Sequence, residues 1–85
     1  MLLAIDVGNT SIVFGVFAGK TLTASWRLST HGKRTPDELG VIVLQMLQNR
    51  AIDVKQIDAV ILCSVVPPLT GTVVEMVRNY VQRDA

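Results

Sequence analysis

The chain has 85 residues, which is enough for one small domain and too little for two. Hydrophobic residues make up 49% of it and charged residues 18%, so it has more apolar material than a disordered segment. A formal net charge of +1, with no long run of either sign, argues against a dedicated nucleic-acid binder. No stretch approaches the roughly 18 apolar residues of a membrane helix, and the beginning of the chain does not resemble a signal peptide. The single cysteine and single histidine exclude an intrachain disulfide and a zinc cluster, and they favour a cytoplasmic location.

The first third of the chain predicts three antiparallel strands. Residues 2–7 are an apolar run that Gly8 and Asn9 end, and residues 11–17 continue with β-branched and aromatic side chains, which is a hairpin pattern. Residues 21–28 alternate strictly between apolar and polar. The face expected to be buried consists of Leu22, Ala24, Trp26 and Leu28.

A helix is predicted to begin after a polar loop at residues 29–34 and to run to about Asn49 or Arg50. Thr35-Pro36-Asp37-Glu38 supplies an N-cap hydroxyl, a proline at the first helical position and a glutamate three residues after the cap. Gly40 weakens this helix and indicates close packing on the sheet. Apolar residues recur at helical spacing, at Leu39, Ile42, Val43, Met46 and Leu47.

The last third predicts one more strand and a second helix. Residues 57–64, which follow a turn, are nearly all apolar, as in a parallel strand covered on both faces, and this places Cys63 in the core. Residues 69–83 have the spacing of a helix. A right-handed crossover makes the first, third and fourth strands parallel. Asp6, Gly8 and Asn9 should then lie beside residues 64–66 at the carboxyl edge of the sheet, where open α/β sheets bind ligands.

The segment with the most chemical content is Asp6-Val7-Gly8-Asn9-Thr10 at the tip of the first hairpin. Gly8 and Asn9 tolerate left-handed backbone, and the turn N–H groups with the Thr10 hydroxyl can converge on a phosphate oxygen. Asp6 can hold Mg²⁺ against the phosphates of ATP. Taken alone, these five residues are better explained as a hairpin turn that binds nothing.

Four segments together resemble the type III pantothenate kinases, a family that includes the Bvg accessory factor homologues. The first also resembles the phosphate motif of the acetate kinase, sugar kinase, heat-shock chaperone and actin superfamily. This resemblance implies an α/β mixed sheet of ribonuclease H-like topology, incomplete here, with residues 1–85 as the N-terminal part of the first kinase domain. The four segments are residues 1–10 (MLLAIDVGNT), 26–30 (WRLST), 34–38 (RTPDE) and 64–69 (SVVPPL).

The activity that the resemblance implies is ATP-dependent phosphorylation of pantothenate to 4'-phosphopantothenate, the first step of coenzyme A biosynthesis. Asp6 would organise Mg²⁺ and the phosphates, while Gly8, Asn9 and Thr10 would form the phosphate turn; a monovalent cation is also compatible with the family. The family's catalytic aspartate belongs to a Gly-x-Asp-Arg motif that these 85 residues lack. No catalytic residue is therefore assigned in this chain, and the chain alone is expected to be inactive.

The resemblance also implies a homodimer, and an open apolar sheet edge predicts a dimer or higher oligomer independently. Two other functions stay open: a non-catalytic α/β interaction module, and a transcription-accessory role that rests on the family name alone. Helix capping accounts for Asp37 and Glu38, and a solvated loop accounts for Lys33 and Arg34. His31 has no neighbour in the sequence that suggests a ligand or relay role.

Overall fold

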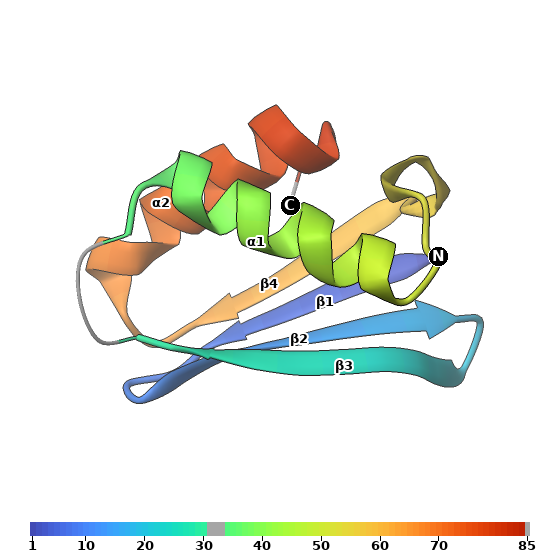
Figure 1. The fold of residues 1–85 in the computed structure, drawn as a ribbon. Helices are drawn as coiled ribbons and strands as arrows, with labels where there is room; N and C mark the ends of the chain where they lie inside the picture. The colour runs from blue at the N-terminus through green and yellow to red at the C-terminus, as the bar shows by residue number, and fades with distance from the viewer. Residues whose placement is uncertain (31–33, 85) are drawn as a thin grey trace.

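Four strands form one mixed sheet, and the structure, a computed structural model, describes residues 1–30 and 34–84 (Figure 1). The strands span Leu2–Val7 (β1), Ser11–Ala18 (β2), Thr21–Ser29 (β3) and Ala59–Ser64 (β4). They lie in the order β3-β2-β1-β4. The pairs β1–β2 and β2–β3 are antiparallel and the pair β1–β4 is parallel. The predicted α/β class, three-strand meander and parallel fourth strand are thus confirmed.

Both helices cover the same face of this sheet (Figure 1). The first, α1, spans Pro36–Asn49 and has the predicted capping box: the Glu38 N–H donates to Thr35 Oγ1 at 3.1 Å, and the Thr35 N–H donates to Glu38 Oε1 at 2.9 Å. The second, α2, spans Pro67–Met76 and continues as the π-helix η2, Val77–Val81. It begins two residues earlier than predicted because both prolines fit the first turn of a helix, where no backbone N–H is required. Among the described residues, neither of these helices nor any other is long and apolar enough to span a membrane.

The hydrophobic core lies between the helices and the covered face of the sheet. Trp26 is buried there as predicted, and its ring stacks on Phe14 with the centroids 5.2 Å apart. The Arg50 guanidinium at the end of α1 covers the same indole at 5.3 Å. The strand residues of this core are Leu3, Ile5, Val7, Ile12, Phe14, Val16, Ala24, Trp26 and Val60.

The predicted buried stripe of β3 is wrong at Leu22, whose side chain is 52% exposed. Val16 pairs with Ala24 but Phe17 pairs with Leu22, so Thr23 is an extra residue in a β-bulge. An extra residue reverses the alternation of faces beyond it. The Thr23 hydroxyl donates to the carbonyl of Val16 at 3.0 Å and holds the bulge in place.

The second face of the sheet is open, which corrects two expectations for the fourth strand. Ile61 is 54% exposed and Cys63 is exposed, so β4 is covered on one face only and Cys63 is not a core residue. The strand also begins at Ala59, two residues later than predicted, because Ile57 still closes the 3-10 helix η1 (Val54–Gln56) with a hydrogen bond from its N–H to Val54 O. In the predicted loop before α1, residues 31–33, with His31 and Lys33, lie outside the described residues.

Gly40 was expected to pack closely on the sheet, but it packs against the second helix instead. A Cβ atom at this position would lie 2.3 Å from Cδ1 of Tyr80. The Tyr80 hydroxyl donates to Oδ1 of Asp37, one turn earlier in α1, and this hydrogen bond, together with burial, raises the pKa of Tyr80. Gly40 therefore allows the tyrosine ring to lie flat on α1 and to join the two helices.

The start of β1 is attached to the segment that leads into β4. The Met1 ammonium donates to Gln56 O at 2.7 Å and to Oδ2 of Asp58 at 2.8 Å, and the Asp58 N–H donates back to Met1 O at 2.8 Å. Hydrogen bonding to the ammonium holds the pKa of the Asp58 carboxyl below its usual value. These contacts fix the parallel register that brings the other ends of β1 and β4 together.

Candidate functional site

The carboxyl ends of β1 and β4 lie side by side, as predicted. Asp6 pairs with Cys63 and Val7 with Ser64. The Val65 N–H then donates to Val7 O at 3.0 Å, so the ladder continues one residue past the end of β4. This edge of the sheet includes the loop between β1 and β2, which contains Gly8, Asn9 and Thr10.

The loop is tight, but its backbone does not have the left-handed conformation that was expected. The Gly8 N–H donates to Ser11 O at 2.9 Å and closes the turn. Neither Gly8 nor Asn9 has a positive φ, so the turn does not use left-handed backbone. A Cβ at position 8 would lie 3.2 Å from the Ser11 carbonyl oxygen, a closer contact than most side chains make, and glycine avoids this contact.

Thr30, just after β3, holds the carbonyl side of this loop. Its hydroxyl donates to Asn9 O at 2.6 Å and its N–H donates to Thr10 O at 3.2 Å. The N–H groups of Asn9 and Thr10 donate to no acceptor in residues 1–30 and 34–84. A turn with fixed carbonyls and free N–H groups is suited to bind an anion.

Thr30 belongs to the segment WRLST, for which the sequence predicts no role at the loop. The available signal was a threonine directly after the third strand. Because β1 and β3 run in the same direction, their carboxyl ends meet at one edge. A hydroxyl at that point can reach the loop that follows β1.

Asp6 lies on the open face of the sheet, beside the loop. Its neighbours along the strand, Ile5 and Val7, point into the core, and Asp6 itself is exposed. It lines a shallow depression of about 430 Å³ on the open face, which is otherwise mostly apolar. The carboxylate has no ion-pair partner in the described part of the chain. The depression is lined among others by Ala4, Val13, Gly15, Ile61 and Cys63.

The donor set at this edge fits one kind of metal site. The described residues contain no group of three or more histidine, cysteine, aspartate or glutamate side chains that could enclose a metal ion. Mg²⁺ differs from zinc in this respect, because it is commonly held by one or two carboxylates, several waters and the phosphates of a substrate. A single exposed Asp6 beside free N–H groups therefore fits Mg²⁺ that arrives with a nucleotide.

The turn between β4 and α2 forms the other wall of this edge and offers little to an anion. Ser64 Oγ accepts from the Val66 N–H at 3.2 Å and from the Thr70 hydroxyl at 2.8 Å, which fixes the turn. Pro67 and Pro68 occupy the first two positions of α2 and have no N–H to donate. The helix entry thus explains these prolines, and the anion donors of the edge belong to the β1–β2 loop.

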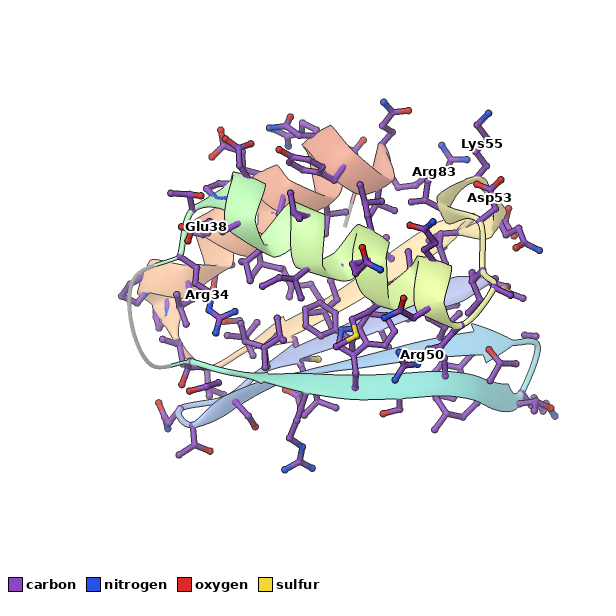
Figure 2. All side chains as sticks on the ribbon, in the orientation of Figure 1. Arg34, Glu38, Arg50, Asp53, Lys55 and Arg83 are labelled. Atoms are coloured by element: carbon purple, nitrogen blue, oxygen red, sulfur yellow. The ribbon has the colours of Figure 1, made fainter. Side chains whose placement is uncertain are left out.

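Charged side chains lie at both ends of the sheet (Figure 2). Arg34, which directly precedes the capping residue of α1, lies at the end that contains the β1–β2 loop, on the side of the helices. Asp53, Lys55 and Arg83 lie at the opposite end. The Arg83 guanidinium donates to Ile57 O at 3.1 Å, so it has a structural role at that end.

Fold and site define an α/β protein with a tight hairpin loop at the carboxyl edge of a mixed sheet, and comparison with known proteins shows its family. The family model described as Type III pantothenate kinase matches residues 2–85. Three curated relatives, each named type III pantothenate kinase, are similar to this chain. That of Moorella thermoacetica is 49% identical over 79 residues, that of Myxococcus xanthus 49% over 80, and that of Geobacter sulfurreducens 46% over 80.

The chain therefore belongs to the type III pantothenate kinase family. The alignments cover 93 to 94% of this chain but 31% of each relative. The chain thus spans about a third of the length of the curated relatives that it matches.

Proposed function

We propose that this chain supplies the ATP phosphate-binding part of a kinase that phosphorylates pantothenate to 4'-phosphopantothenate, the first step of coenzyme A biosynthesis. One observation supports this most directly: the N–H groups of Asn9 and Thr10 donate to no acceptor among the described residues, while Thr30 donates hydrogen bonds to the carbonyls of the same loop. The family name of the relatives agrees with this function.

In this proposal each residue at the edge has one task. The N–H groups of Asn9 and Thr10 and the Thr10 hydroxyl donate to phosphate oxygens. Gly8 keeps the loop narrow, so that a phosphate can approach the backbone. Asp6 holds Mg²⁺, directly or through water. The metal, when bound, supplies positive charge to the phosphates, since phosphoryl transfer requires mainly positioning and charge neutralisation from the protein.

The same fold supports an assignment of the chain to a kinase domain. We assign residues 1–85 to the N-terminal part of a ribonuclease H-like kinase domain, supported by the strand order β3-β2-β1-β4 and the helix between β3 and β4. No glycine of the chain begins a Gly-x-Asp-Arg sequence. The catalytic aspartate and the pantothenate site are therefore assigned to parts of the kinase other than these 85 residues.

We further propose self-association as a dimer or higher oligomer and a cytoplasmic location. Leu22 and Ile61 are large apolar side chains more than half exposed on the open face, and β3 and β4 are both edge strands. A single free cysteine suits a reducing compartment.

Alkylation of Cys63 offers a direct test of nucleotide binding. Cys63 is the one cysteine of the chain, is exposed, and pairs with Asp6 across β1 and β4. Mg·ATP at the loop should slow its reaction with iodoacetamide several-fold, because the ligand covers the thiol and limits access of the reagent. The rate is to be measured by mass spectrometry over a range of Mg·ATP concentrations.

The matched control is the same reaction with Mg²⁺ and adenosine, which has no phosphate and should leave the rate unchanged. If saturating Mg·ATP also leaves the rate unchanged, the chain does not bind nucleotide at this edge. The non-catalytic interaction module would then be the better description of the chain.

A further inference from the structure

The four strands contain two charged side chains, Asp6 and Arg27, and the structure describes every residue of these strands. Asp6 pairs with Val13 across β1 and β2, and Val13 pairs with Arg27 across β2 and β3. Residues in one cross-strand row point to the same face of a sheet. Arg27, which is exposed, therefore shares the open face with Asp6.

The β-bulge creates this row. At the turn, Ala18 pairs with Thr21, and continued pairing without a bulge would place Arg27 opposite Ile12. Ile12 is buried in the core, so Arg27 would then face the core as well. The extra residue Thr23 shifts the register by one and turns Arg27 to the face on which Asp6 lies.

Arg27 and Asp6 do not neutralise each other. Adjacent strands are about 4.8 Å apart, so the two Cα atoms, with β2 between them, are about 10 Å apart. No ion pair joins the two side chains, and the Arg27 guanidinium has no hydrogen-bond or ion-pair partner in residues 1–30 and 34–84. The uncharged Val13 thus lies between a carboxylate and a guanidinium that have no ion-pair partner in the described part of the chain.

We infer that Arg27 is a phosphate-binding residue whose guanidinium binds the terminal phosphate of ATP, across Val13 from Asp6 and its Mg²⁺. The inference rests on the proposed function. A guanidinium binds phosphate through two parallel N–H donors. One Mg²⁺ leaves part of the triphosphate charge uncompensated, and an arginine on the far side of the phosphate can compensate it.

The competing explanation is that Arg27 protects an edge strand. β3 is at the edge of the sheet, and charged side chains on edge strands discourage pairing with other chains. That role requires a charge but no nucleotide. The two explanations differ in whether substitution of Arg27 lowers the affinity for ATP more than the affinity for ADP.

The test compares the affinities of the chain for Mg·ATP and Mg·ADP by calorimetric titration. Arg27→Gln should lower the affinity for Mg·ATP by about ten- to a hundredfold, as expected for lost charge-assisted hydrogen bonds. It should leave the affinity for Mg·ADP nearly unchanged. Arg27→Lys should recover part of the affinity for Mg·ATP that Arg27→Gln loses. Lys20→Gln, which removes the same charge in the turn at the opposite end of β2 and β3, should change neither affinity.

Equal weakening of Mg·ATP and Mg·ADP, or no weakening, overturns the assignment of Arg27, and increased self-association of Arg27→Gln in sedimentation would then support the edge-strand role. If Asp6→Asn loses Mg·ATP while Arg27→Gln retains it, only the Arg27 inference fails. If the unaltered chain binds no Mg·ATP, the proposed function fails and the Arg27 inference fails with it.

Discussion

Replacing Asp6 by asparagine should lower the affinity of the chain for Mg·ATP by about ten- to a hundredfold, the range typical for residues that hold a metal directly or through its shell. Asparagine keeps the shape of the side chain but removes the charge that attracts Mg²⁺. Without Mg²⁺ the expected effect has the opposite sign, because the carboxylate then repels the phosphates. Titration with ATP in excess Mg²⁺ and again in EDTA measures both effects.

Glu75→Gln is the matched control for this change. Glu75 is exposed on α2, and its side chain has no hydrogen-bond or ion-pair partner within the described ranges. The substitution removes the same single charge. It should leave both titrations as they are in the unaltered chain. If Asp6→Asn keeps a Mg²⁺-dependent affinity for ATP, Asp6 is not the metal residue and the β1–β2 loop loses its assigned chemistry.

The second large effect is a loss of folding stability, expected when Gly40 in the contact between the two helices is replaced. Gly40→Ala would place Cβ 2.3 to 2.7 Å from the Cδ1, Cγ and Cδ2 atoms of Tyr80. These atoms lie near the base of the ring, so the ring cannot turn away without losing its packing and its hydrogen bond to Asp37. Such overpacking typically costs about 1 to 3 kcal/mol.

Gly71→Ala separates this cost from helix propensity. Gly71 also lies in a helix, α2, but a Cβ there meets nothing within 4 Å. Both substitutions gain up to about 1 kcal/mol of helix propensity. Urea unfolding should therefore show Gly40→Ala to be less stable than Gly71→Ala by about 1 to 3 kcal/mol. Equal stabilities would show that the helices can separate at no cost, and the contact described here would then be wrong.

Local patterns were sufficient to predict the elements and their order. The capping box at Thr35 fixes the first helix because both of its hydrogen bonds depend only on two residues three positions apart, Thr35 and Glu38. The hairpin loop at Gly8 and Asn9 and the crossover through α1 determine the parallel pairing of β1 and β4, and with it the positions of Asp6 beside Cys63 and of Val7 beside Ser64.

Features that depend on register or on distant neighbours were not predictable. The bulge at Thr23 has no signal in its own sequence, and it reverses the face of Leu22 and turns Arg27 towards the side of Asp6. Gly40 could be identified as a close contact, but the partner, Tyr80, lies 40 residues later. The exposure of Cys63 is a property of the open face, which an apolar strand sequence does not reveal.

The most direct measurement of the phosphate loop is the response of backbone amide resonances to Mg·ATP in the ¹⁵N-labelled chain. The largest shifts should fall on Asn9 and Thr10, whose N–H groups donate to no acceptor within the ranges that the structure describes. Smaller shifts are expected at Val65, and none at Gly19 in the turn at the other end of the sheet. Large shifts that avoid Asn9 and Thr10, or no shifts at saturating Mg·ATP, would contradict the assignment of this loop to nucleotide phosphates.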